Sequence, residues 1–141
     1  MAAVELITDT GPLVAFFNRG DQYHSWAKEQ FDRIFSPLIT CEAVLSEVIF
    51  LLHDDGLSVE PLFQAIDRGK LILRFSAEEH WQDIRRLIRK YEDLPMSLAD
   101  ACLVRMSELT PKCQVFTLDR HFCVYRRNAR QLIPILAPFA S

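Results

Sequence analysis

Residues 4–12 read Val-Glu-Leu-Ile-Thr-Asp-Thr-Gly-Pro, an apolar segment that runs into a carboxylate and then into a turn. The apolar residues favour extended backbone, while Gly11 and Pro12 end the strand and allow a helix to begin. This stretch predicts the first and central strand of a sheet, with Asp9 at its carboxyl end. Ligands of open α/β sheets bind beyond those ends, so Asp9 is a candidate for chemistry. On this stretch alone, capping of the next helix by Asp9 or Thr10 is the preferred explanation.

Downstream, segments of strand length alternate with segments of helical periodicity. We expect helices over residues 13–17, 21–34, 41–53, 58–69, 76–91 and 97–106, and strands over 38–40, 70–75, 115–118 and 132–135. Such alternation predicts a mostly parallel sheet of four to five strands covered on both faces. The expected fold is therefore a three-layer α/β/α domain that takes in the whole chain, residues 1–141, without a linker or internal repeat.

Composition narrows the class of protein. A chain of 141 residues with 50% hydrophobic residues is the size of one domain and can bury a core. No segment is apolar for long enough to span a bilayer and no signal peptide is apparent, so we expect a soluble, cytoplasmic protein. A net charge of -3 argues against a protein that coats nucleic acid non-specifically, although a local basic patch is compatible with it.

The cysteines do not have the paired spacing of a zinc site. They fall singly at Cys41, Cys102, Cys113 and Cys123, three of them inside or beside apolar runs. We expect reduced, mostly buried thiols. The four histidines are equally scattered, so a zinc enzyme is not expected.

Four acidic residues occupy positions from which they can meet. Asp9 and Asp119 follow strands, Asp100 opens a helix after a loop, and Glu47 lies beside the apolar stripe of helix 41–53. Strand ends and helix starts converge on one edge of a parallel sheet, so the four carboxylates are expected in one crevice. For Asp100 a capping pair with Ser97 is an alternative explanation.

Carboxylates gathered in one crevice repel one another unless some are protonated or a cation is present. Oxygen ligands without Cys or His favour Mg²⁺, with Mn²⁺ as a second possibility. This chemistry suits phosphodiester hydrolysis.

Basic residues supply the complementary charge in two places. Arg120, Arg126, Arg127 and Arg130 follow the last acid and are candidates for holding a nucleic-acid backbone. Helix 76–91 has a polar face with Arg85, Arg86, Arg89 and Lys90, which is either solvated or in contact with phosphates. Surface salt bridges are the alternative explanation for any single arginine.

Four short motifs occur in a recognisable order. They are Asp-Thr-Gly-Pro-Leu at residues 9–13, Leu-Ser-Glu-Val at 45–48, Leu-Pro-Met-Ser-Leu-Ala-Asp-Ala at 94–101 and Thr-Leu-Asp-Arg-His-Phe at 117–122. Together they resemble a PIN domain, most closely the VapC-type toxins of bacterial toxin–antitoxin pairs. The resemblance covers essentially the whole chain.

This resemblance implies a metal-dependent ribonuclease. Asp9 and Asp100 would be the principal Mg²⁺ ligands, Glu47 would bind the metal or position water, and Asp119 would complete the acidic set. Glu42 is a rival for the role of Glu47, which is preferred because it follows Val-Leu-Ser as in the family motif. Asp93 is a further candidate near the metal, with loop capping as the alternative.

The resemblance also implies a homodimer that a small antitoxin neutralises. Apolar residues of the first and third helices, namely Phe16, Phe17, Leu51 and Leu52, suit a dimer face or a groove for a partner helix, although core packing explains them too.

Other classes of protein fit less well. A dinucleotide-binding enzyme is rejected because the chain lacks a Gly-x-Gly-x-x-Gly motif. A phosphoacceptor domain would need a second acid where Gly11 stands. The remaining alternative is a PIN-like module that binds RNA or a partner with weak or no nuclease activity.

Overall fold

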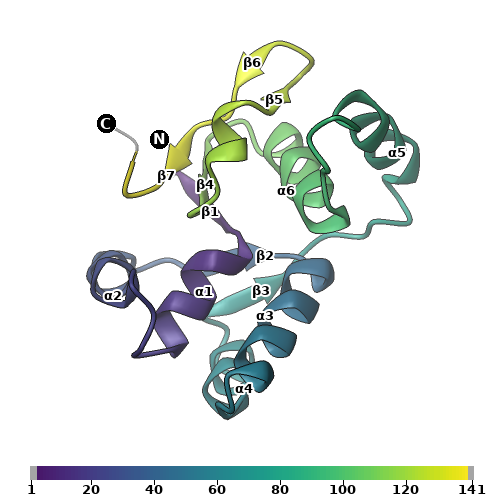
Figure 1. Ribbon diagram of the computed structural model, residues 1–141. Helices are drawn as coiled ribbons and strands as arrows, with labels where there is room; N and C mark the ends of the chain where they lie inside the picture. The colour runs from purple at the N-terminus through teal and green to yellow at the C-terminus, as the bar shows by residue number, and fades with distance from the viewer. Residues whose placement is uncertain (1–2, 140–141) are drawn as a thin grey trace.

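A five-stranded parallel sheet forms the centre of the structure, a computed structural model that describes residues 3–139 (Figure 1). The strand order is β3-β2-β1-β4-β7, and all four pairings are parallel. The strands are β1 (Glu5–Thr8), β2 (Leu38–Thr40), β3 (Leu71–Leu73), β4 (Cys113–Phe116) and β7 (Ile135–Leu136). The predicted parallel sheet is confirmed, with β1 at its centre.

Within the described residues, six α-helices complete the three layers (Figure 1). They are α1 (Thr10–Phe17), α2 (His24–Arg33), α3 (Glu42–Asp54), α4 (Glu60–Asp67), α5 (Trp81–Lys90) and α6 (Leu98–Leu109). Helix α6 packs beside β1 and β4 and is flanked by α5, whereas α1 packs against α2 and α3. No helix within residues 3–139 has the length and apolar character needed to cross a membrane.

The central strands are buried on both faces, as expected for a parallel sheet between helical layers. Ile7, Val115 and Phe116 lie almost completely out of solvent. Cys41, Cys102 and Cys113 are buried free thiols, while Cys123 is a free thiol at the surface. The core therefore holds the strand ends rigidly and fixes the side chains that follow them.

The C-terminal strands differ from the prediction. The predicted strand 132–135 is divided at Pro134, which has no N–H to donate to a ladder. Residues before it form β6 (Gln131–Leu132), which pairs antiparallel with β5 (Arg126–Arg127) in a separate hairpin. Residues after it form β7, and the Pro134 carbonyl accepts a hydrogen bond of 2.8 Å from Val115 N.

Two further element boundaries differ from those predicted. Helix α5 begins at Trp81 rather than at residue 76, because residues 77–80 form a turn in which Ser76 Oγ accepts from Glu79 N at 3.3 Å. Strand β4 is residues 113–116 rather than 115–118, since its register with β1 pairs Cys113 with Glu5. The strand thus ends two residues earlier than predicted. Asp119 does not follow it directly but caps the 3₁₀-helix η1 (Arg120–Cys123).

Candidate active site

Asp9 lies directly after the central strand and caps α1. Its Oδ1 accepts a hydrogen bond of 2.7 Å from Thr10 N, and its Oδ2 accepts one of 2.7 Å from the hydroxyl of Thr117. The residue is only 6% exposed. Capping and chemistry are therefore not alternatives here, because the cap places a buried carboxylate at the sheet edge.

Thr117 connects the ends of two adjacent strands. It follows β4 and is fully buried, and its Oγ1 donates to Asp9 while accepting from Asp119 N at 2.9 Å. Asp119 in turn accepts from His121 N at 2.9 Å and so caps η1. One hydroxyl thus fixes the positions of two of the four predicted acids.

Asp100 lies in the first turn of α6, where three hydrogen bonds hold it. It forms a reciprocal capping box with Ser97, in which Ser97 Oγ accepts from Asp100 N at 3.0 Å and Asp100 Oδ2 accepts from Ser97 N at 3.3 Å. The same Oδ2 accepts a hydrogen bond of 3.1 Å from the hydroxyl of Tyr125. The carboxylate is therefore oriented by its own helix and by a distant tyrosine.

Glu47 reaches the same edge from the middle of α3. Its Oε2 accepts a hydrogen bond of 2.6 Å from the hydroxyl of Thr10, the residue after Asp9. Glu42 in the first turn of α3 and Asp93 in the loop before α6 are both exposed. Of the two glutamates, Glu47 is the one whose carboxylate is hydrogen-bonded to the residue after Asp9.

The four carboxylates influence one another electrostatically. Burial raises the pKa of Asp9 to about 7 against hydrogen bonds from Thr117 and Thr10 that lower it, and the charges of Asp100 and Asp119 raise it further. Burial also raises the pKa of Asp100, with smaller contributions from Asp119 and Glu47. The structure thus gathers in one region the four acids that the sequence singled out.

The donors in this region suit a hard cation. Within residues 3–139 no three potential metal-binding side chains converge closely enough to enclose an ion by themselves. Two carboxylates with water in the remaining positions is nevertheless a common arrangement for Mg²⁺, which retains several waters. A buried Asp9 beside other acids is also the kind of group that a nearby cation would stabilise in its charged form. The residues present therefore fit Mg²⁺.

The sequence did not predict the hydrogen bonds by which three residues hold the acids. Thr10 and Thr117 stand beside or near an acid inside the quoted motifs, so their positions offered a signal. Tyr125 offered none, because it is 25 residues from Asp100 in the chain. Only the folded structure brings its hydroxyl to that carboxylate.

The four arginines after Asp119 have different environments. The guanidinium of Arg127 donates to Ser107 O at 2.9 Å and to Pro111 O at 3.3 Å, so it binds the end of α6 and is not available to a phosphate. Arg126 donates to carbonyls at the end of η1, including Cys123 O at 2.8 Å. Arg120 and Arg130 are exposed. We therefore remove Arg127 from the candidate RNA-binding set.

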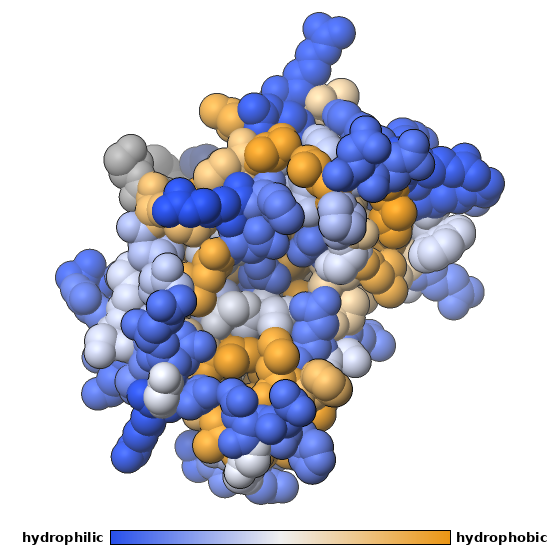
Figure 2. Space-filling view, in the orientation of Figure 1, coloured by the Kyte–Doolittle hydropathy of each residue, from blue (hydrophilic) through white to orange (hydrophobic). Residues whose placement is uncertain are grey.

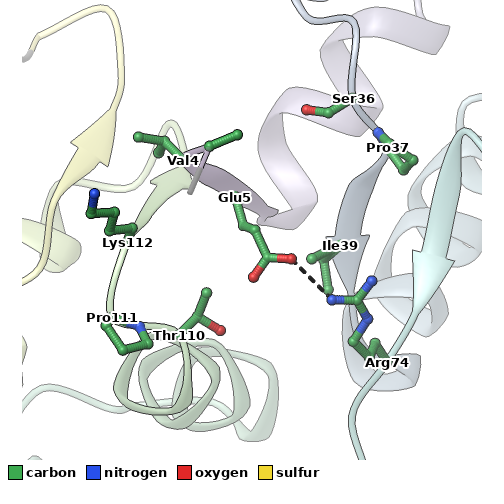
Figure 3. Close-up of a pocket in the computed structure, with 10 residues that line it drawn as sticks. Val4, Glu5, Ser36, Pro37, Ile39, Arg74, Thr110, Pro111 and Lys112 are labelled. Atoms are coloured by element: carbon green, nitrogen blue, oxygen red, sulfur yellow. Dashed lines mark hydrogen bonds and ion pairs between the residues drawn. The ribbon is translucent and has the colours of Figure 1, made fainter. Parts of the chain in front are cut away.

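A hollow of considerable size lies elsewhere in the structure. It has a volume of about 670 Å³ and includes Val4, Glu5 and Lys112 from the starts of β1 and β4 (Figure 3). An ion pair of 3.0 Å joins Glu5 to Arg74 across it. None of the four acids lines this hollow, so size alone does not identify the candidate active site.

Fold and site define a class of protein, an α/β/α domain with an acidic, all-oxygen site at the carboxyl ends of its central strands. Within that class, the chain belongs to the PIN domain family, whose sequence pattern matches residues 6–128. This match confirms the family that the four motifs implied.

Two relatives from Mycobacterium tuberculosis agree with this assignment. The chain is 26% identical over 124 residues to Ribonuclease VapC26 of strain H37Rv, an alignment that covers 86% of this chain and 92% of that protein. The crystal structure of VapC20, described as a sarcin-ricin loop cleaving toxin, matches with a TM-score of 0.70 at 21% identity, over 82% of this chain and 91% of that chain. The first supports the similarity to VapC-type ribonucleases, and the second supports the fold.

Proposed function

We propose that this protein is a Mg²⁺-dependent endoribonuclease and the toxin of a toxin–antitoxin pair. The observation that carries the proposal is the buried carboxylate of Asp9 at the end of the central strand, close enough to Asp100 and Asp119 for their charges to raise its pKa. The similarity to Ribonuclease VapC26 supports the same chemistry.

Asp9 and Asp100 are the residues that would hold Mg²⁺ (or Mn²⁺), with Asp119 adjacent. When bound, the cation supplies charge stabilisation to the phosphoryl oxygens and lowers the pKa of a bound water. Glu47 is fixed by Thr10 at 2.6 Å and is suited to orient the attacking water. The hydroxyls of Thr117 and Tyr125 keep Asp9 and Asp100 in place.

An antitoxin helix has a suitable groove away from the acids. A hollow of about 430 Å³ lies between α1, α2 and α4 and is lined by apolar side chains that include Phe16, Phe17, Phe31 and Ala65. An amphipathic helix binds in such grooves through its apolar face. Of the apolar residues singled out in the sequence, Leu52 lies in the core and Leu51 is exposed outside this groove.

A homodimer is supported by apolar surface on α3. Phe50 and Leu51 are neighbours on this helix and are 63% and 41% exposed, so together they offer an apolar surface that a second copy can cover. Sedimentation of the wild-type protein and of Phe50→Glu tests the dimer. Conversion of a dimer into a monomer by this change is the expected result, and a monomeric wild type would contradict it.

Cleavage of RNA tests the enzymatic proposal directly. Antitoxin-free protein would be incubated with total cellular RNA and with an RNA containing a sarcin–ricin loop, in Mg²⁺ or in chelator. We expect discrete products with the wild type that disappear in chelator and in Asp9→Ala, Asp100→Ala and Glu47→Gln. Glu42→Gln is the matched control, because it changes an exposed glutamate in the same helix.

Two results would contradict the proposal. Cleavage that persists in Asp9→Ala and Asp100→Ala would place the chemistry elsewhere. Absence of cleavage by a folded wild type, with retained RNA binding, would favour a PIN-like binding module.

A further inference from the structure

The outer face of α5 is a concentrated basic surface. Ile84 and Leu87 point into the core, while Arg85, Arg86, Arg89 and Lys90 are exposed on the opposite side of the helix. Figure 2 shows this hydrophilic region at the upper right, where Figure 1 places α5. We call these four residues the α5 basic face.

Intramolecular pairing does not account for this face. Arg86 contacts Asp83 at 3.1 Å, and Lys90 donates to Ala129 O at 2.9 Å. The guanidinium groups of Arg85 and Arg89 take part in none of the hydrogen bonds or ion pairs found within residues 3–139. Asp83 is also shared with Arg105 at 3.4 Å, so its charge is already balanced.

The arrangement is also unfavourable for the isolated helix. Arg85 and Arg89 are four residues apart, as are Arg86 and Lys90, and like charges at this spacing repel. The helix dipole favours cations in the last turn, which explains only Arg89 and Lys90. A polyanionic ligand would relieve the repulsion of the whole set.

The space between these side chains suits phosphate groups. Gln82, Arg85, Arg86 and Arg89 border a hollow of about 270 Å³. A second hollow of about 190 Å³ shares Arg86 with the first and is lined by both basic and acidic side chains, namely Arg86, Lys90, Arg126, Asp83 and Glu108. Guanidinium groups present paired donors that match phosphate oxygens, so the first hollow, which has three arginines and no acid in its lining, suits a nucleic-acid backbone better than an uncharged ligand.

The α5 basic face is connected to the acidic cluster by direct contacts. Lys90 Nζ lies 5.2 Å from the ring centre of Tyr91, and that ring packs edge-on against Tyr125 with centres 5.0 Å apart. The Tyr125 hydroxyl then bonds Asp100 at 3.1 Å. The C-terminal end of α5 is therefore the end that lies toward the candidate active site.

From these observations we propose that the α5 basic face binds the sugar-phosphate backbone of the RNA substrate at a distance from the bond that is cut. This inference rests on the proposed ribonuclease function and specifies its substrate class. Backbone contacts carry no base information, so the face selects RNA that is long or folded enough to reach both α5 and the acids.

A charge-matched pair of double variants tests the inference. Arg85→Gln/Arg89→Gln removes two charges from the α5 basic face. The control, Arg19→Gln/Lys28→Gln, removes two exposed charges, one before α2 and one within it. Thermal melts establish that both are folded. Binding of a fluorescent stem-loop RNA is measured by anisotropy in chelator over a series of salt concentrations, so that no cleavage occurs.

We expect the α5 variant to bind RNA at least about tenfold more weakly at 0.1 M salt. The slope of log affinity against log salt should become less steep by about 1.5, because two phosphate contacts are lost. In Mg²⁺ its KM for the stem-loop should rise with kcat unchanged, while a short single strand spanning only the cleavage site is cut as by the wild type. The control variant should match the wild type throughout.

Equal affinity and equal salt slope in the two double variants would overturn the inference. Binding of poly-glutamate is measured in the same way. If the α5 variant keeps its affinity for RNA but loses affinity for poly-glutamate, the inference is also overturned, since the ligand of this face would then be an acidic protein segment. A wild type that binds the stem-loop but cuts no RNA would refute the proposed nuclease instead, and the binding data in chelator would still decide the role of α5.

Discussion

The hydroxyl of Tyr125 donates a hydrogen bond of 3.1 Å to Oδ2 of Asp100, and the tyrosine itself is fully buried. The neighbouring Tyr91 is also buried, but its hydroxyl accepts from the backbone N–H of Arg126 at 2.9 Å. The two tyrosines are both buried and pack against each other, but only the hydroxyl of Tyr125 contacts a candidate metal ligand. This difference allows positioning of Asp100 to be separated from general packing.

Tyr125→Phe should lower kcat for RNA cleavage about tenfold and raise the Mg²⁺ concentration needed for half-maximal binding. A hydrogen bond to a charged group contributes about 1.5–3 kcal/mol, and its loss leaves Asp100 less firmly oriented. Titration calorimetry with Mg²⁺ measures the second effect without turnover. Tyr91→Phe is the control, and the same Mg²⁺ response in both variants would assign Tyr125 to packing alone.

The pKa of Asp9 predicts how stability depends on pH in chelator. The folded state holds the Asp9 proton to about pH 7, whereas the ordinary value is 3.8. The contribution of Asp9 to stability is therefore greatest below about pH 4, falls as the pH rises to about 7 and stays low above it, a difference on the order of 4 kcal/mol. Asp9→Asn should melt higher than the wild type at pH 8 and similarly at pH 4.

Mg²⁺ should reverse this order, because it binds the ionised carboxylate. It is expected to raise the melting temperature of the wild type at pH 8, but not that of Asp9→Asn. Parallel melting curves for the two proteins at all pH values would show that Asp9 is not the destabilising group.

Thr10→Val should reduce kcat about tenfold with little change in KM for RNA. The substitution keeps the shape of the side chain and removes the 2.6 Å hydrogen bond that fixes Glu47. Thr10→Ser keeps the hydroxyl and should restore activity. Steady-state kinetics of the two variants decide the matter, and equal loss in both would indicate that the Thr10 methyl group matters more than its hydroxyl.

Arg127→Met should destabilise the protein by about 2 kcal/mol without weakening RNA binding. Its guanidinium donates to carbonyls at the end of α6, and several such bonds of about 1 kcal/mol each are lost. Arg130→Met, at an exposed position, should leave stability unchanged. Denaturant unfolding and RNA anisotropy test both, and a reduced salt slope for Arg127→Met would return it to the RNA-binding set.

Much of the fold follows from local sequence. Residues 4–12 predict a strand, a carboxylate and a helix start because an apolar run and the turn at Gly-Pro are features of a few consecutive residues. Asp9, Asp100 and Asp119 follow the same logic, since caps and strand ends are also local features. Boundaries differ from the prediction at residues 76–80, where a local turn precedes the helix, and at Pro134, where the predicted strand is divided between two pairings.

Tertiary structure decided which groups hold and surround the acids. The bond from Thr10 to Glu47 spans 37 residues, and the bond from Thr117 to Asp9 spans 108. No periodicity or spacing encodes such pairings, because they depend on strand order and on how helices pack. The sequence alone thus determined that the acids share one edge of the sheet. Packing determined that Asp9 is buried, that Tyr125 orients Asp100, and that Arg127 faces inward while Arg85 and Arg89 face solvent.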